Sequence, residues 1–323
     1  LTAFRMLACR ASLATWVVVC YLTALPSAQA NPRAAYRESG EGFRVGVKVR
    51  ILDIADGSTR RLVDDWMQED TPTWGPDGRT LAAAAARERS FDIFQAPIGG
   101  SRAWLTEHPG SDREPAWSPN GRRIAFVSHR DWPDAPAIYL MDADGSDLRR
   151  LTDAPWRSKE PAWSPDGERL AYAAGDGEGA SILRVLDVAT GVDQALTEDD
   201  AYRGSPAWSW DGRYMAYEYH VPGVRGYHIR VRTLDGRDDW GVTDNTPGRN
   251  SSPAWTPSGD ISFLMLGQQR HNIGVVGPRG GDVDMLTKTG TYKEHLTWYN
   301  PRYFAVRAAS ILQPRVWGWL KRS

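Results

Sequence analysis

The strongest constraint on this chain of 323 residues is a seven-residue motif that recurs at nearly constant spacing. One copy reads Pro-Ala-Trp-Ser-Pro-Asp-Gly over residues 161–167, and its tryptophan, Trp163, serves as the reference position. The corresponding tryptophans of all copies are Trp74, Trp117, Trp163, Trp208, Trp255 and Trp298, separated by 43, 46, 45, 47 and 43 residues. A period of roughly 40–50 residues is typical of a four-stranded propeller blade. The spacing therefore predicts one repeat architecture along most of the chain.

The residues around each motif predict four short strands per repeat. In the copy at 161–167 the first strand ends in a Pro-Asp-Gly turn, where Pro sets φ and Gly accepts a positive φ. Residues 169–173, 182–188 and 194–197 are expected to form the second, third and fourth strands. Complete repeats end on the same aliphatic–threonine pair: Leu105-Thr106, Leu151-Thr152, Leu196-Thr197, Val242-Thr243 and Leu286-Thr287.

The two ends of the repeat region are complementary halves. Residues 43–52 alternate apolar and polar, and residues 60–63 return as a second strand, with no tryptophan anchor before this pair. After the last anchor only one further strand is expected, at residues 303–306. Five full repeats and two halves predict an all-β, six-bladed β-propeller closed by pairing of N- and C-terminal strands, which removes exposed sheet edges. The propeller is expected over residues 43–310, with residues 311–323 as a C-terminal tail packed on it.

The first thirty residues differ in kind from the repeats. Arg5 and Arg10 precede an apolar run over residues 11–25, and Ser27-Ala28-Gln29-Ala30 offers a cleavage site. This pattern predicts a signal peptide over residues 1–30, because the apolar run is short for a membrane span. A buried helix or an uncleaved anchor is the alternative. Residues 31–42 are polar and aperiodic, which predicts a flexible lead-in.

Composition indicates the cellular location and the class of partner. Both cysteines, Cys9 and Cys20, lie within the predicted signal peptide, so the mature chain contains no thiol. The mature net charge is −3, which gives no electrostatic reason to expect nucleic acid. We expect a periplasmic or secreted monomer with no stable membrane span after cleavage and no cofactor.

The repeat also resembles a known family. The motif at residues 161–167, the Ile-Ala-Phe of the second strand at 124–126, the Ile-Tyr of the third at 138–139 and the closing Leu-Thr are similar to the WD-like repeat of TolB-type β-propellers. The chain's ending, with Trp298-Tyr299-Asn300-Pro301 and Trp317-Gly318-Trp319-Leu320-Lys321, is similar to that of bacterial exported TolB-like proteins. The resemblance implies a six-bladed propeller in the periplasm. TolB itself carries a separate N-terminal α/β domain, for which the segment before Phe43 offers no room, so its role in the Tol–Pal system is not implied.

Familiar catalytic motifs are missing from the sequence. It contains no G-x-S-x-G, H-E-x-x-H or P-loop, and its six histidines are scattered without metal-ligand spacing. Residues 142–147 begin like a calcium loop, but Asp144-Gly145 favours a hairpin turn there. Whether a cation occupies the channel stays open at this point.

The position three residues before each anchor tryptophan is the best candidate for a ligand site. It varies between copies, and propeller geometry predicts that its side chains form a ring at one mouth of the central channel. These residues are Thr71, Glu114, Glu160, Ser205, Ser252 and His295. Arg130, Trp132, Arg225 and Arg270 lie on loops expected to adjoin this mouth. The alternative is a solvated rim whose carboxylates only tie neighbouring strands together.

Two functional hypotheses follow from this candidate site. The first is an exported, non-catalytic propeller that binds a protein, peptide or glycan at the mouth, as an interaction scaffold in the cell envelope. The second is a propeller hydrolase or lyase acting on a sugar or lactone, with Glu114, Glu160 and His295 as acid–base groups. The two glutamates occupy equivalent positions in adjacent repeats, which repetition alone would produce. We therefore favour the first hypothesis.

Overall fold

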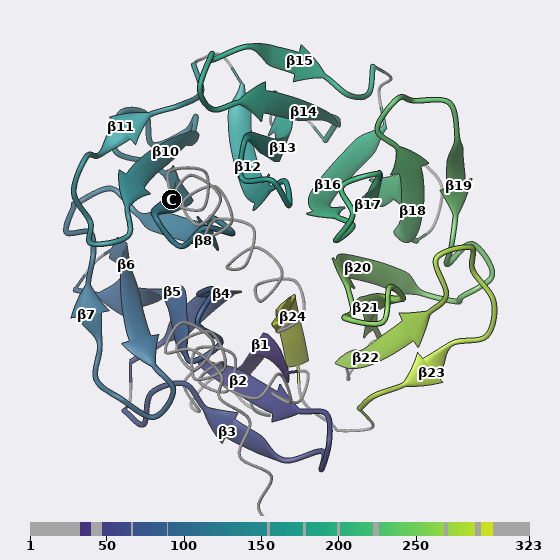
Figure 1. Ribbon diagram of the computed structural model, residues 1–323, viewed down its shortest axis with the longest axis horizontal. Coiled ribbons are helices and arrows are strands. Elements are labelled where there is room, and N and C mark those ends of the chain that lie inside the picture. The colour runs from purple at the N-terminus through teal and green to yellow at the C-terminus, as the bar shows by residue number, and fades with distance from the viewer. Residues whose placement is uncertain are drawn as a thin grey trace, which may run out of the picture. The chain divides into compact units, whose positions relative to one another are not determined.

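The structure of the protein is a computed structural model. It describes residues 33–39, 47–65, 67–88, 90–153, 156–176, 179–198, 201–221, 226–267, 271–287 and 292–299. These residues form six four-stranded antiparallel sheets arranged around a common centre (Figure 1). The predicted all-β, six-bladed propeller is thereby confirmed. Within the described part of the chain, no helix is long and apolar enough to cross a membrane.

Each blade runs from an innermost strand at the channel to a short outermost strand. We number the blades in chain order of their innermost strands. Blade 1 contains β4 (Glu69–Trp74), β5 (Thr80–Arg87), β6 (Ser90–Pro97) and β7 (Ala103–Trp104). Blade 2 contains β8 (Asp112–Trp117), β9 (Arg123–Ser128), β10 (Ala137–Asp142) and β11 (Arg149–Arg150). Blade 3 contains β12 (Arg157–Trp163), β13 (Arg169–Gly175), β14 (Ser181–Asp187) and β15 (Asp193–Ala195). Blade 4 contains β16 (Tyr202–Trp208), β17 (Tyr214–His220), β18 (His228–Thr233) and β19 (Asp239–Gly241). Blade 5 contains β20 (Arg249–Trp255), β21 (Ile261–Leu266), β22 (His271–Val276) and β23 (Asp284–Met285). Blade 6 contains β24 (Tyr292–Tyr299), β1 (Arg33–Ser39), β2 (Lys48–Asp53) and β3 (Thr59–Arg61).

Local chemistry explains the ends of the strands. In blade 3, Gly167 adopts a φ of 69° and donates its N–H to the carbonyl of Ser164 at 2.8 Å, which closes the turn after the innermost strand. In blades 1 to 5, the closing threonine forms a hydrogen bond with the third strand. Each threonine Oγ1 accepts the N–H of a third-strand residue at 2.7–2.9 Å, through the pairs Thr106–Ile93, Thr152–Ile138, Thr197–Leu183, Thr243–Ile229 and Thr287–Ile273.

The hydrophobic core lies in the seams between blades. The anchor tryptophans pack there, as the repeat predicts, because an aromatic side chain at fixed register buries a large area at each seam. Four of the six indole N–H groups also bind across the seam. Trp163, Trp208 and Trp255 donate at 2.9–3.1 Å to the carbonyls of Ala116, Ala162 and Ala207 in the preceding blade, and Trp298 donates to Ser262 Oγ at 2.7 Å.

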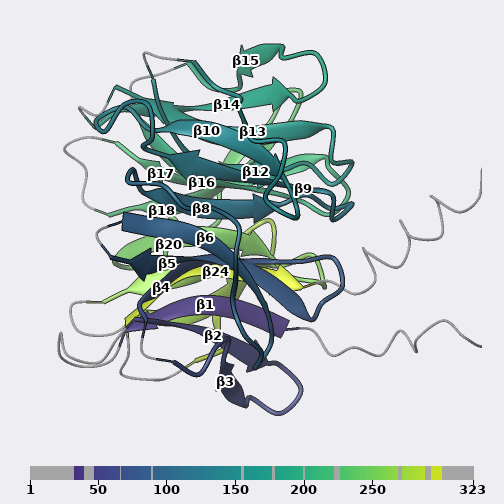
Figure 2. The same ribbon diagram turned by 90° about the vertical axis from the view of Figure 1, so that its left-hand side faces the viewer.

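Blade 6 closes the ring by joining the two ends of the described chain. Its innermost strand, β24, pairs with β1, and β2 and β3 follow outward (Figure 2). The register places Ala34 opposite Trp298 and Arg37 opposite Glu294. The predicted closure by N- and C-terminal strands is confirmed. Three strands of this blade come from the N-terminal side of the chain and one comes from the C-terminal side.

The expected flexible lead-in at residues 31–42 is wrong over residues 33–39, which form β1. The second strand of a blade, counted from the channel, is covered by a neighbouring blade on each face. Its sequence is therefore a short run of buried residues, without alternation of apolar and polar residues. Ala34, Ala35 and Tyr36 form such a run, each at most 2% exposed. The strand expected at residues 303–306, the tail at 311–323 and the signal peptide at 1–30 lie outside the described residues.

Candidate functional site

Six polar side chains meet around the channel axis, at the positions expected from the sequence. We call them the channel ring: Thr71, Glu114, Glu160, Ser205, Ser252 and His295. Together with the residues that follow them, five prolines and Leu296, they line a cavity of about 150 Å³. Each lies near the middle of its innermost strand, so the ring sits within the channel and not at its outermost rim.

The backbone at the channel ring is strained in the same way in every blade. All six residues have φ between 45° and 56°, a left-handed conformation that costs a non-glycine residue about 1–3 kcal/mol. Each innermost strand is irregular in register at this point, as a β-bulge requires. Bulges re-aim side chains, and here six bulges aim six side chains at one cavity.

Side chains of the channel ring bind the backbone of the next blade. The N–H of Glu114 donates to Thr71 Oγ1 at 3.1 Å. The N–H of Glu160 donates to Glu114 Oε2 at 2.7 Å, and that of Ser205 to Glu160 Oε2 at 2.5 Å. The carboxylates therefore do tie neighbouring strands together, as the structural alternative predicted. This role uses only one oxygen of Glu114, since its Oε1 forms no hydrogen bond with a described residue.

Glu218 on β17 joins the ring, and the sequence analysis missed it. Its Oε1 accepts both the Ser205 hydroxyl at 2.8 Å and the Ser252 N–H at 2.7 Å. The side chains of Ser205 and Ser252 are too short to form this link between blades 4 and 5, and Glu218 forms it instead. A signal was present, because the register of Glu218 holds a buried apolar residue in blades 1, 2, 3 and 5, whereas blade 6 has Arg37 there. The apolar residues are Ala84, Val127, Ala173 and Leu264.

Three carboxylates consequently share one side of the channel. Burial raises the pKa of Glu114 to about 7, and the negative charge of Glu160 adds to the shift. Burial and Glu160 raise the pKa of Glu218 to about 7 in the same way, and burial also raises the pKa of Glu160. Among the described residues, no lysine or arginine forms an ion pair with these three groups. We call Glu114, Glu160 and Glu218 the acidic side of the channel.

The opposite side of the channel is organised around Asp70. Its Oδ2 lies 3.1 Å from Arg113 Nη1, and its Oδ1 lies 3.3 Å from Arg37 Nε and 3.7 Å from His295 Nε2. Burial lowers the pKa of His295, and the two guanidinium groups lower it further against the opposing effect of Asp70. His295 is therefore neutral at neutral pH. The channel offers carboxylates on one side and hydrogen-bond donors on the other.

The loop residues expected around the site differ in their surroundings. Trp132 is 58% exposed. Arg130 is largely enclosed, and its Nη2 donates to Asp112 Oδ2 at 2.9 Å, so an internal partner already balances its charge. Arg225 and Arg270 lie outside the described residues. In the described part of the chain, no group of three or more His, Cys, Asp or Glu side chains is placed to hold a metal ion.

The closed ring of four-stranded antiparallel blades, with polar side chains around its channel, defines a six-bladed β-propeller. The family model of the TolB β-propeller domain matches residues 44–202. The chain is a TolB-like six-bladed β-propeller.

Solved structures show the same likeness. TolB from Acinetobacter baumannii aligns over 88% of this chain and 71% of its own, at 19% identity and a TM-score of 0.69. A candidate TolB from Agrobacterium tumefaciens aligns over 84% of this chain and 99% of its own, at 19% identity and a TM-score of 0.65. An oligogalacturonate lyase from Vibrio parahaemolyticus aligns over 68% of each chain, at 13% identity and a TM-score of 0.52. At such identities the likeness establishes the fold alone.

Proposed function

We propose that this protein is an exported, non-catalytic scaffold of the cell envelope that binds a peptide segment of a protein partner in its channel. The segment enters with a cationic group, such as a lysine or arginine side chain, directed at Glu114, Glu160 and Glu218. The TolB-like fold supports an envelope location, and the predicted signal peptide supports export. Fold alone does not specify the partner, so the proposal rests on the channel.

The acidic side of the channel is the observation that carries the proposal. Burial raises the pKa of Glu114 and of Glu218, and the negative charge of Glu160 raises both further, so the three carboxylates destabilise one another when charged. A bound cationic group relieves this repulsion and donates charge-assisted hydrogen bonds to the carboxylates. Acceptors remain for it, since Glu114 Oε1 and Glu218 Oε2 form no hydrogen bond with a described residue. The donors around Asp70 suit the carbonyl groups of the same peptide.

A direct test compares peptides that differ in one charge. Fluorescein-labelled Gly-Lys-Gly and Gly-Gln-Gly peptides are titrated with the secreted protein, and binding is read by fluorescence anisotropy. We expect the lysine peptide alone to bind, and the double variant Glu114→Gln, Glu160→Gln to bind it at least about tenfold more weakly, a loss of about 1.4 kcal/mol.

The control is Asp144→Asn, which removes one negative charge outside the channel. Asp144 caps an exposed turn through its own Oδ1 and lies away from the channel ring. This variant should bind the lysine peptide as the parent does. Normal binding by the glutamine double variant, with loss of binding by Asp144→Asn, would place the site on the wrong part of the propeller.

One observation favours a second candidate function, a lyase or hydrolase acting on a sugar or lactone. A carboxyl group with a pKa of about 7, as for Glu114, suits general acid–base catalysis near neutral pH. An oligogalacturonate lyase also shares the fold. Incubation with oligogalacturonate distinguishes the two functions, because a lyase releases an unsaturated product that absorbs ultraviolet light. Product formed by the parent and lost in Glu114→Gln would favour the enzyme.

A further inference from the structure

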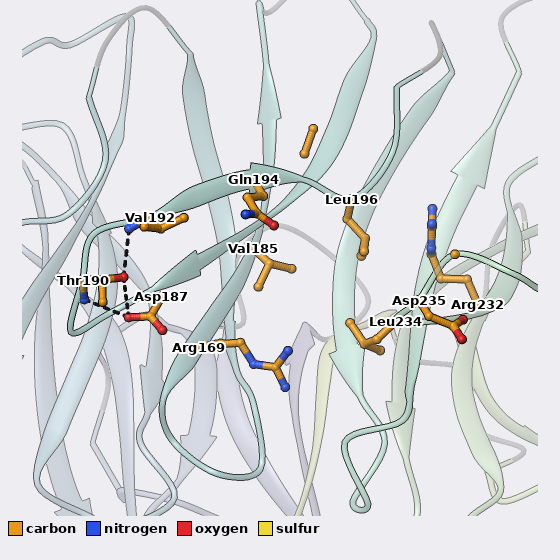
Figure 3. A pocket seen from close by; sticks show the side chains of 12 residues that line it. Arg169, Val185, Asp187, Thr190, Val192, Gln194, Leu196, Arg232, Leu234 and Asp235 are labelled. Carbon is orange, nitrogen blue, oxygen red and sulfur yellow. Dashed lines mark hydrogen bonds between the residues drawn. The ribbon is translucent and has the colours of Figure 1, made fainter.

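A second cavity lies outside the channel, between blade 3 and blade 4. Its volume is about 560 Å³. Strands β14 and β15 border it on one side and the turn after β18 on the other (Figure 3). We call it the interblade pocket, and it shares no residue with the channel ring.

Arg232 breaks the pattern of the repeat at this pocket. It pairs with Met215, and the residue in this register is apolar and buried in each of the other five blades. Those residues are Leu52, Ala96, Met141, Leu186 and Val276, each at most 5% exposed. Arg232 is itself half-buried, so a charged side chain stands where the other blades place a buried apolar one.

The guanidinium of Arg232 has no partner within the described part of the protein. Its Nε is buried and without a hydrogen bond, and it forms no ion pair. Space is kept open beside it by Gly236, where a Cβ would lie 3.1 Å from Arg232 Nη2. A buried N–H donor left unsatisfied costs about 1–3 kcal/mol, which a bound acceptor would recover.

The two carboxylates at the edge of the pocket are already occupied. Asp187 accepts the N–H and the hydroxyl of Thr190, both at 2.8 Å (Figure 3). Asp235 accepts the N–H of Arg237 at 3.2 Å and lies 3.3 Å from its Nε. Each carboxylate therefore serves its own turn and leaves Arg232 unpaired.

A second cation and an apolar floor complete the pocket. Arg169 projects into it from β13, with its guanidinium 5.0 Å from the centre of the Trp208 ring and 3.6 Å from Asp166 (Figure 3). Gln194 on β15 faces the same space with an amide that can donate. The floor is aliphatic, formed by Val185, Leu196 and Leu234, and no aromatic ring lines the cavity.

We propose that the interblade pocket binds an acidic peptide, independently of the channel. A carboxylate of the peptide pairs with Arg232, and Arg169, whose charge is partly balanced by Asp166, lines the same space. The planar guanidinium fork matches a carboxylate in geometry and charge. A neighbouring aliphatic side chain of the peptide packs on Val185, Leu196 and Leu234. The aliphatic floor favours a peptide over a glycan, because it offers no flat aromatic face to a sugar ring.

Nuclear magnetic resonance provides the test, since arginine Nε–H groups give their own signals. The probe is the peptide acetyl-Leu-Asp-Leu-amide, titrated into the ¹⁵N-labelled protein, with acetyl-Leu-Asn-Leu-amide as the uncharged counterpart. We expect the Asp peptide to shift the Arg232 signal to saturation and the Asn peptide to leave it in place. Arg232→Met, which restores the residue type of Met141 at this register, should weaken binding at least about tenfold without lowering the melting temperature.

Arg122→Met is the matched control. It removes the same charge from the exposed turn after β8, and Arg122 does not line the pocket. Its affinity for the Asp peptide should equal that of the parent. The proposal is overturned if the Asp peptide leaves the Arg232 signal unmoved, or if Arg232→Met binds as well as the parent. A shift caused by trigalacturonate and not by the Asp peptide would overturn the peptide assignment. If Arg232→Met does not fold, the two peptide titrations of the parent decide the matter.

Discussion

At the scale of single residues, the repeat provides an internal reference for every side chain. Positions shared by most blades are structural, as for the threonines that bind the third strand in blades 1 to 5. Residues that depart from an otherwise buried apolar register mark sites. Glu218 and Arg232 both depart in this way, and each lines a cavity or joins the channel ring. Comparison between blades therefore separates packing from function without any second sequence.

The acidic side of the channel predicts a pH-dependent stability. The pKa of Glu114 is raised from 4.5 to about 7 in the folded protein, so the folded state binds the proton more tightly than the unfolded state. The contribution of this group to stability is therefore full below pH 4.5 and is lost as the pH rises towards 7. Glu114→Gln keeps the acceptor for the Glu160 N–H and removes the charge. We expect its melting temperature to exceed that of the parent by a few degrees at pH 8, on the order of 1 kcal/mol, with little difference at pH 4.5.

Thermal unfolding followed by circular dichroism at both pH values measures this effect. Asp144→Asn serves as the control, since hydrogen bonds from Ser146 lower the pKa of that exposed carboxyl. It should show no gain at pH 8. A gain at pH 4.5 as large as that at pH 8 would contradict the assignment of a raised pKa to Glu114.

At the scale of elements, the fold of the propeller depends on blade 6, which closes the ring. Strand β1 lies between β24 and β2, so it completes two sets of backbone hydrogen bonds. Its buried residues also pack into seams on both faces, with Ala35 in one core cluster and Ala34 and Tyr36 in another. No other strand in the described chain can replace it without leaving the ring open.

Deletion of residues 33–39 is therefore expected to prevent folding. The loss leaves the facing edges of β24 and β2 unpaired, and its cost should exceed the ~5–15 kcal/mol of a typical folded domain. The point variant Ala35→Asp, at a fully buried position, should have the same effect, while Ser39→Asp, at the half-exposed end of the strand, should be tolerated. Expression, gel filtration and circular dichroism check these outcomes. A soluble, cooperatively folding product without residues 33–39 would refute the closure.

At the scale of the whole molecule, the proposed cleavage site lies close to the N-terminal end of the propeller. The proposed cleavage site after Ala30 lies two residues before Arg33, where β1 begins. Cleavage would thus leave a mature chain whose first residues enter the closing blade almost at once. The two proposed sites, the channel and the interblade pocket, would then lie on one rigid scaffold.

The mature protein is accordingly expected to begin at Asn31. Mass spectrometry of the intact protein from the periplasm or medium measures this, and Ala28→Arg, which disrupts the small residue of the A-x-A pattern, should retain the precursor. A full-length chain found in the cytoplasm would contradict export.

Much of this architecture could be predicted from the sequence because it depends on local chemistry repeated at a fixed period. The tryptophan spacing determined the number of blades, the Pro-Asp-Gly turns determined where innermost strands end, and the six channel-ring positions followed from one register. Other features depend on what the next blade supplies. Strand β1 is covered on both faces and shows no alternation, so only its place between β24 and β2 identifies it. Glu218 belongs to a second strand and reaches the channel only because Ser205 and Ser252 are short. The unpaired state of Arg232 depends on the turns that occupy Asp187 and Asp235. Tertiary structure decided these points, because burial and pairing arise from contacts between residues distant in the chain.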